Sequence, residues 1–369
     1  MGGIGNGCEC DVTGSEKDQV IILGIETSCD ETSAAILVDG TDLRSHVISS
    51  QIATHQKYGG VVPEIASREH SLHLQPVVQQ ALDEAKLGFS DLSAIAVTRG
   101  PGLVGSLLVG VSGAKAMAYA AGIPLLGINH LEGHIYANFL HHQDIGFPFL
   151  SLLVSGGHTH LILFKAHGQY QVLGQTRDDA AGEALDKVAR TLGLGYPGGP
   201  QIQKVAQEGD AQAFKFPRAM LEPRSLDFSF SGMKSAVLNT LNSAHMRGET
   251  LSVPDLAASF QQAIVDVLVR KTLMAIDQTG VKTLLLAGGV AANRLLRETL
   301  AQTLAERSVR LVSPPPLFCT DNGAMIAVAG YYHYLTGDFA PWTLNAVPGL
   351  GLVLGTCVTQ RSVLRRRAN

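Results

Sequence analysis

Residues 20–38 read VIILGIETSCDETSAAILV, and residues 149–164 read FLSLLVSGGHTHLILF. Each stretch consists of an apolar run, a short polar segment and a second apolar run. Short, continuously apolar runs are typical of buried β-strands. The polar segments, residues 26–33 and 155–159, are predicted to be hairpin tips rich in hydroxyls, carboxylates or glycine. The strands are predicted at 20–25 and 34–38 in the first stretch, and at 149–154 and 160–164 in the second. The same order in two halves of the chain predicts a duplicated unit.

Both halves continue in the same way. In the first half, the apolar periodicity of residues 64–85 predicts a helix, and the strand 94–97 then runs into a glycine turn. In the second half, the strand 283–287 runs into Gly288-Gly289, which opens a helix. We therefore predict an α/β fold of two similar lobes. Ligands are expected in a cleft between the lobes, at the carboxyl ends of strands.

Composition limits the classes of function. The chain has 369 residues, 46% hydrophobic and 16% charged, so it can bury a large core. A net charge of −4 excludes a basic field over the whole protein, although a local patch or a partner could still bind nucleic acid. The five cysteines form no CxxC pair, which argues against a zinc ribbon or a disulfide framework. No apolar run reaches the ~18 residues of a membrane span, so no membrane partner is expected.

The two ends of the chain lie outside the duplicated pattern. Residues 1–19 lack the apolar core of a secretory signal and the arginine-rich pattern of a transit peptide, so we expect a flexible extension on a cytoplasmic protein. Residues 20–129 are expected to form the N-terminal lobe, completed by a helix near residues 324–337. Residues 130–323 are expected to form the C-terminal lobe, and residues 338–369 a tail.

Two glycine pairs follow apolar strands at matching places. Gly156-Gly157 come directly after Ser155, and Gly288-Gly289 precede a predicted helix. Glycine lets backbone N–H groups approach a ligand closely, and N–H groups with hydroxyls suit phosphate oxygens. A single pair would read as an ordinary turn, but two pairs at matching places favour a nucleotide cleft. The sequence contains no GxxxxGK[ST], which argues against the usual phosphate-loop site.

A histidine pair suggests a metal site. His130 and His134 stand four residues apart in a segment that predicts a helix, so both side chains would lie on one face. This spacing suits zinc or iron, but it also suits one capping and one core histidine. Asp321, which follows a proline turn and precedes a helix, is the best third ligand, with a helix N-cap as the alternative. Glu132 does not occupy the glutamate position of the zinc-protease motif HExxH.

Further motifs occur in order from about residue 21 to about residue 337. They are GIETSCDET at 24–32, GVVPE at 60–64, RGPG at 99–102, HLEGH at 130–134, LVSGGHT at 153–159, DDAAGEALDK at 178–187, YPGGP at 196–200, DFSFSGMK at 227–234, GGVAAN at 288–293 and TDNGAM at 320–325. Together they resemble the family of tRNA threonylcarbamoyladenosine-forming transferases, once called O-sialoglycoprotein endopeptidases. The resemblance covers nearly the whole chain.

This resemblance implies the ASKHA fold, the duplicated two-lobe architecture of actin and the sugar kinases, with a central nucleotide and metal cleft. It implies that His130, His134 and Asp321 hold one divalent metal ion, with Fe²⁺ favoured and Zn²⁺ as the alternative. Glu31 would accept a proton or orient the acceptor amine, and Ser155 would act in catalysis as well as in binding. The residues implied for binding the adenylate substrate are Leu153, Val154, Ser155, Gly156, Gly157, Asp186, Gly199 and Asn293.

The reaction implied by the resemblance moves a threonylcarbamoyl group from threonylcarbamoyl-AMP to N6 of the adenosine at position 37 of tRNAs that read ANN codons, and releases AMP. The implied partners are tRNA, threonylcarbamoyl-AMP, a paralogous ASKHA subunit and an ATPase subunit. Three alternatives stay open: a metalloprotease, a noncatalytic ATP-binding ASKHA scaffold, and a small-molecule carbamoyltransferase. The cations considered for contact with tRNA are Lys187, Arg190, Arg218, Arg224, Lys234 and the arginines at 361 and 365–367.

Overall fold

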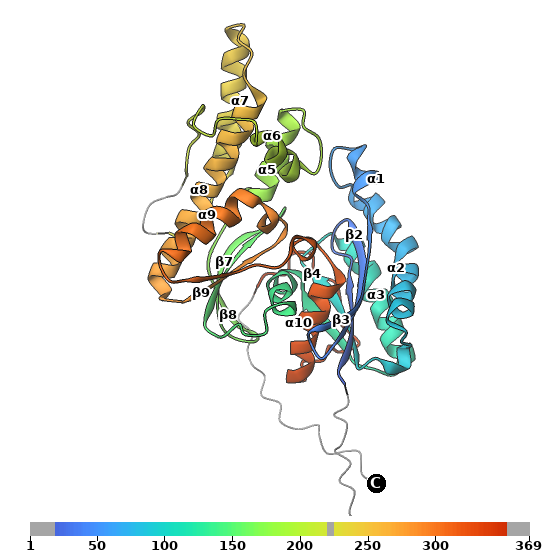
Figure 1. Ribbon diagram of the computed structural model, residues 1–369. Helices are drawn as coiled ribbons and strands as arrows, with labels where there is room; N and C mark the ends of the chain where they lie inside the picture. Colours follow the sequence, from blue (N-terminus) through green and yellow to red (C-terminus); the bar gives the residue numbers. More distant parts are fainter. Residues whose placement is uncertain (1–18, 220–224, 353–369) are drawn as a thin grey trace, which may run out of the picture.

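Two five-stranded sheets organise the chain in the computed structural model, which describes residues 19–219 and 225–352 (Figure 1). The first sheet has the order β3-β2-β1-β4-β5 and the second the order β8-β7-β6-β9-β10. The strands of the first sheet are β1 Ile21–Glu26, β2 Glu31–Val38, β3 Asp42–Ser50, β4 Ala94–Gly100 and β5 Leu125–Asn129. Those of the second are β6 Phe149–Val154, β7 Thr159–Ala166, β8 Gln169–Gln175, β9 Thr283–Ala287 and β10 Arg310–Val312.

The two sheets have the same topology. In each sheet the first strand in chain order lies in the centre, antiparallel to the second and parallel to the fourth, as β1 does with β2 and β4. β6 pairs with β7 and β9 in the same two senses. The duplication predicted from the sequence is therefore confirmed, including its hairpins.

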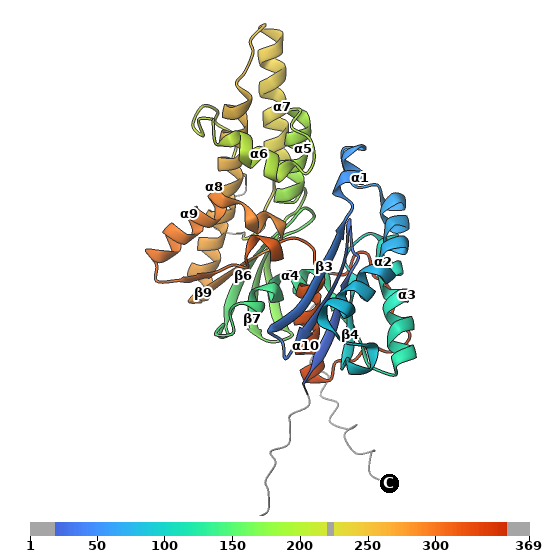
Figure 2. The same cartoon turned by 45° about the vertical axis from the view of Figure 1, so that its right-hand side comes forward.

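Helices form layers around and between the sheets. α2 and α3 cover the outer face of the first sheet, and α4 and α10 lie between the two sheets (Figure 2). α5, α6, α8 and α9 belong to the C-terminal side of the molecule, and α7 rises at its top in both views. The helices are α1 Ile52–Gln56, α2 Pro63–Ala85, α3 Val104–Ala121, α4 His130–Tyr136, α5 Ala181–Thr191, α6 Gly198–Ala206, α7 Ser231–Met246, α8 Val253–Thr279, α9 Arg294–Ala305 and α10 Gly323–Thr336, with short 3-10 turns at Phe89–Asp91, Ala137–Leu140, Gly289–Ala292 and Pro316–Phe318.

Both faces of the central strands are buried. Along β1, Leu23 and Ile25 pack into the core shared with α2 and α3, whereas Ile22 packs into the core shared with α4 and α10. That second core also contains Leu153 and Leu285 of the other sheet, so it joins the two lobes. Because neither face meets water, the strands read as continuous apolar runs rather than as an alternation.

Helix α3 is the one helix within residues 19–219 and 225–352 whose length and composition would allow it to cross a membrane. It packs against α2 and β4, and Val111, Ala114 and Ala118 are part of the hydrophobic core of the first lobe. Its apolar character is therefore used in the packing of this lobe.

One expectation about the first hairpin was wrong. The polar segment was read as extending to Ser33, but β2 begins at Glu31. The Thr32 hydroxyl lies 2.7 Å from His70 Nδ1, and the Ser33 hydroxyl donates to the Val47 carbonyl at 2.7 Å. Because both hydroxyls have partners, they can be buried within a strand.

The chain ends are described in part. Residues 1–18 of the expected extension and residues 353–369 of the expected tail lie outside the described residues. Residues 338–352 lie against the first lobe. Ala340 donates its N–H to the Leu125 carbonyl at 2.8 Å, and Val347 donates its N–H to the Arg99 carbonyl at 2.7 Å. Of the cysteines in the described ranges, Cys29 and Cys319 are free.

Candidate metal centre and nucleotide site

The two histidines lie on α4, which begins directly after β5. Asn129 is the N-cap of this helix, because its side-chain oxygen accepts from the Leu131 N–H at 2.9 Å. The ring centroids of His130 and His134 are 4.7 Å apart, and both residues are buried. The alternative of a capping histidine is therefore excluded, since Asn129 has that role.

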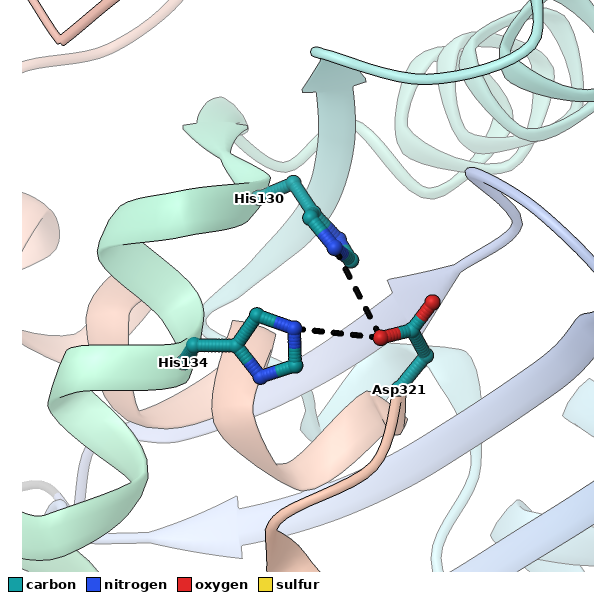
Figure 3. A group of neighbouring side chains, drawn as sticks. All are labelled: His130, His134 and Asp321. Carbon is teal, nitrogen blue, oxygen red and sulfur yellow. Dashed lines mark ion pairs between the residues drawn. The ribbon is translucent and has the colours of Figure 1, made fainter. Parts of the chain in front are cut away.

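Asp321 lies in the turn before α10 and faces the two histidines (Figure 3). Its Oδ1 is 3.1 Å from His134 Nε2 and 3.5 Å from His130 Nε2. Asn322 caps α10 by accepting from the Met325 N–H at 2.9 Å, so Asp321 is not the N-cap. From the sequence alone, Asp321 could have been either a metal ligand or the N-cap of this helix.

The three side chains fit a divalent metal ion. One ligand atom from each of His130, His134 and Asp321 lies within 4.8 Å of the others. His134 is 1% exposed, and within the described residues neither of its ring nitrogens makes a well-aligned hydrogen bond. A buried polar atom without a partner is costly, and a metal ion would satisfy it. Two imidazole nitrogens and a carboxylate oxygen are a donor set that iron and zinc accept.

The carboxylates of the site attract positive charge. Burial disfavours the imidazolium form of His130, but the Asp321 and Glu26 carboxylates outweigh it and raise the pKa of His130 to about 9. Burial would raise the pKa of Asp321, yet the histidines hold it below its usual value. This cluster is therefore strongly polar inside an otherwise apolar layer.

The glycine tip between β6 and β7 meets two other segments. A Cβ at Gly182, in the first turn of α5, would lie 2.5 Å from the Ser155 carbonyl oxygen. A Cβ at Gly288 would overlap the Val154 carbonyl oxygen, and the φ of Gly288 is 87°. Both segments can approach the tip only because they lack side chains there. The tip, the start of α5 and the turn after β9 therefore form one continuous backbone surface.

The other residues expected at the adenylate are placed around this surface, with part of their polar capacity used internally. Asp186 Oδ1 accepts from the Gly198 N–H at 2.7 Å and also bonds the Gly199 N–H, at the start of α6. Asn293 caps α9 through the Leu296 N–H and donates to Gln261 Oε1 at 3.0 Å. Leu153 and Val154 are buried at the end of β6, Ser155 is 8% exposed, and Gly156 and Gly157 are exposed.

Glu31, the candidate proton acceptor, is the first residue of β2. Burial and the neighbouring Asp30 raise the pKa of Glu31 to about 10, so this carboxyl group is protonated at neutral pH. Burial and Asp30 also raise the pKa of the Cys29 thiol, which keeps it in its unreactive form.

Four polar residues in this part of the molecule, Glu26, His158, Glu132 and His333, were given no role from the sequence. Glu26 Oε2 lies 3.0 Å from His130 Nδ1, on the far side of the ring from Asp321. Burial, with the charges of His130 and His160, lowers the pKa of His158 to about 3, so its ring is neutral. Glu132 lies 3.2 Å from His333 of α10. All but His333 belong to recognised motifs, but their roles depend on which strands and helices are neighbours.

Several cations considered for tRNA contact make bonds within the chain. Lys187 lies 2.7 Å from Asp179 and 2.8 Å from Glu183. Arg218 pairs with Asp266, and Arg190 of α5 donates to the Gly59 carbonyl, between α1 and α2. Arg224 and the arginines at 361 and 365–367 lie outside the described residues.

Two lobes built on five-stranded sheets of the same topology define the ASKHA fold. Solved structures of this class are similar in fold to the chain. HypF from T. kodakarensis has a TM-score of 0.60 at 14% identity, covering 86% of this chain and 48% of that one. An activator of 2-hydroxyisocaproyl-CoA dehydratase from Clostridium difficile, solved with ADPNP, has a TM-score of 0.51 at 14% identity over 86% of this chain and 97% of that one.

The family described as tRNA N6-adenosine threonylcarbamoyltransferase, TsaD, matches residues 42–328. A protein of that name from Desulfitobacterium hafniense is 75% identical over 92% of this chain and 99% of its own length. Another from Moorella thermoacetica is 57% identical over 90% of this chain and 97% of its own length. The chain belongs to this family, and it is a transferase that acts on tRNA.

Proposed function

We propose that the chain transfers the threonylcarbamoyl group of threonylcarbamoyl-AMP to N6 of the adenosine at position 37 of tRNAs that read ANN codons, with release of AMP. The main support for the proposal is that His130, His134 and Asp321 lie together in a chain that belongs to this family. The proposed partners are tRNA, threonylcarbamoyl-AMP, a paralogous ASKHA subunit and an ATPase subunit, in the cytoplasm. We keep the lobe boundaries at residues 20–129 and 130–323 as part of the proposal.

His130, His134 and Asp321 would hold one divalent ion, with Fe²⁺ favoured over Zn²⁺. When bound, such an ion supplies Lewis-acid polarisation of donor oxygen atoms and a fixed orientation for the donor. The mixed anhydride already has a good leaving group, and the N6 amine is a poor nucleophile. Positioning and stabilisation of the attacked carbonyl are therefore the main tasks of the protein.

The glycine tip would bind the donor. The Ser155 hydroxyl and the N–H groups of Gly156 and Gly157 suit phosphate and carbonyl oxygens, and the two glycines are exposed. Asp186, Gly199 and Asn293 would bind the ribose or the base with the polar atoms that their internal bonds leave available, and Leu153 and Val154 would support the tip. Because Glu31 is protonated at neutral pH, we propose that it orients the acceptor amine rather than taking its proton.

In the transfer step, the N6 lone pair forms a bond to the carbamoyl carbon. The bond from that carbon to the phosphate oxygen breaks, AMP leaves with the electron pair, and one proton passes from N6 to water. No covalent intermediate on the protein is needed, which agrees with the raised pKa of the Cys29 thiol.

In the peptidase alternative, Glu132 would have to act as the general base at the metal. Glu132 lies between the two histidines in sequence, but it is directed to His333 on α10. The small-molecule alternative would share the donor chemistry and differ only in the acceptor, so the acceptor has to be tested directly.

The test is a reconstituted reaction. The purified chain would be mixed with unmodified tRNA, the adenylate-forming synthase and its substrates, and the partner subunits, and the nucleosides would be read by mass spectrometry. We expect threonylcarbamoyladenosine with the wild type and with His142→Ala, a control histidine eight residues beyond His134, and none with His134→Ala. Adenylate formation without modified tRNA in the wild-type reaction would overturn the proposal.

A further inference from the structure

Glu26 is a fully buried carboxylate at the end of β1. Its Oε2 accepts from the Thr98 hydroxyl at 2.6 Å and lies 3.0 Å from His130 Nδ1, while its Oε1 accepts from the Ser28 N–H. A buried charge is costly unless hydrogen bonds and an opposite charge compensate it. Both carboxylate oxygens of Glu26 have hydrogen-bond partners, and one of these partners is a candidate metal ligand.

Strand order places Glu26 behind His130. β1, β4 and β5 are neighbouring parallel strands, so their carboxyl ends meet at one edge of the sheet. Glu26 ends β1, Thr98 lies near the end of β4, and His130 follows the last residue of β5. The two ring nitrogens of His130 therefore have different neighbours: Nδ1 faces Glu26, and Nε2 lies 3.5 Å from Asp321 Oδ1.

The hydroxyl of Ser28 also lies 3.1 Å from His130 Nδ1. A hydroxyl can either donate to a ring nitrogen or accept from it, whereas a carboxylate can only accept. The carboxylate of Glu26 thus decides that Nδ1 carries the hydrogen, which leaves the lone pair of a neutral ring on Nε2. A carboxylate behind a ligand histidine also makes that histidine a stronger ligand.

We infer that Glu26 is a positioning residue for the metal centre: it accepts the Nδ1–H of His130 and so directs Nε2 toward the space shared with His134 and Asp321. This inference rests on the proposed metal site. His134 differs from His130, because its Nδ1 is buried without a hydrogen-bond partner within the described residues. The orientation of the site therefore depends more on the His130 side than on the His134 side.

The experiment compares Glu26→Gln with Glu132→Gln in the full chain. Both variants neutralise a buried carboxylate that bonds a histidine, but only Glu26 bonds a ligand histidine. The dissociation constant for Zn²⁺ would be measured by competition with a chromogenic chelator, and the fold by thermal unfolding of the metal-free protein. We expect Glu26→Gln to weaken Zn²⁺ binding by about 10- to 100-fold and Glu132→Gln to leave it within about 3-fold.

A spectroscopic measurement separates positioning from general stability. In the Zn²⁺-loaded wild type with ¹⁵N-labelled histidine, NMR should show His130 with its hydrogen on Nδ1 and its metal bond through Nε2. The Nδ1–H proton should move upfield in Glu26→Gln and stay in place in Glu132→Gln. The wild-type spectrum shows which ring nitrogen of His130 carries the hydrogen and which binds Zn²⁺, so it tests the inference even if Glu26→Gln does not fold.

Two results would overturn the inference about Glu26 and leave the proposed metal site standing. The first is that Glu26→Gln keeps the wild-type Zn²⁺ affinity while His130→Ala loses Zn²⁺ binding. The second is that His130 of the wild type binds Zn²⁺ through Nδ1. If His130→Ala and His134→Ala both keep the wild-type affinity, the proposed metal site fails instead, and the inference fails with it.

Discussion

His134 and Asp321 lie near opposite ends of the segment 130–323, yet His134 Nε2 lies 3.1 Å from Asp321 Oδ1. His134 lies on α4, and Asp321 directly precedes the capped start of α10. The two helices pack against each other between the sheets. The geometry of the candidate metal centre therefore depends on how closely α10 approaches the first sheet.

That approach depends on Gly24 of β1. A Cβ at Gly24 would overlap the Gly323 carbonyl oxygen and lie 2.5 Å from the Ala327 N atom. Both are backbone atoms, so Gly24→Ala has to displace α10. We expect a loss of about 1–3 kcal/mol in the free energy of unfolding, measured by denaturant titration, and weaker metal retention, measured by elemental analysis.

The control for this prediction is Gly146→Ala, because an added Cβ there meets no atom within 4 Å. We expect Gly146→Ala to leave the free energy of unfolding and the metal content unchanged. If Gly24→Ala keeps wild-type stability and metal content, the close approach of α10 does not determine the site.

The buried pair of Glu132 and His333 predicts a pH-dependent stability. Although burial opposes it, the carboxylates of Glu132 and Asp338 raise the pKa of His333 to about 10 from an ordinary value of 6.5. Since the folded-state pKa is the higher one, the stabilisation is complete below about pH 6.5 and is lost as the pH rises toward about 10. His333→Gln should therefore cost about 3–5 kcal/mol at pH 6 and much less at pH 10.

Thermal unfolding of the wild type and His333→Gln across this pH range measures the difference. His245→Gln, at an exposed position near the end of α7, is the control and should show a small difference at every pH. A His333→Gln deficit of the same size at pH 6 and pH 10 would contradict the assignment.

Asp178 connects two of the recognised motifs. Its carboxylate accepts from the hydroxyls of Ser229 and Ser231 at 2.6 and 2.7 Å and from the Phe230 N–H at 2.9 Å, at the start of α7. Asp178→Ala removes these bonds and should destabilise the start of α7 by about 1–2 kcal/mol. Hydrogen–deuterium exchange should then be faster in the first turn of α7. The exposed Asp277→Ala should not change it, and equal exchange in both variants would refute the role of Asp178.

Much of the fold could be predicted because both faces of the central strands are buried. The continuous apolar runs that became β6 and β9 have the predicted bounds. The edge strands β3 and β8 were not predicted, because they are partly exposed and polar residues interrupt their pattern. Thr32 and Ser33 were assigned to a turn, since their hydrogen bonds come from segments distant in sequence.

The candidate site could also be predicted only where a feature has a local cause in the sequence. The histidine spacing has a local cause, one helical turn, and so could be read from the sequence. The sequence could not show whether Asp321 or Asn322 caps α10, because both residue types cap helices well. The contact of Glu26 with His130 depends on the order of β1, β4 and β5, for which the sequence carries no local signal.

Metal-assisted transfer is tested most directly by a single-turnover reaction with threonylcarbamoyl-AMP labelled at its carbamoyl carbon. Metal-loaded wild type and His134→Ala, each with the partner subunits and unmodified tRNA, would be compared by the rate at which label enters tRNA adenosine. We predict transfer by the wild type and a rate at least about 100-fold lower for His134→Ala, because several kcal/mol of stabilisation would be lost. Equal rates for the two proteins would contradict a role of the metal centre in the transfer.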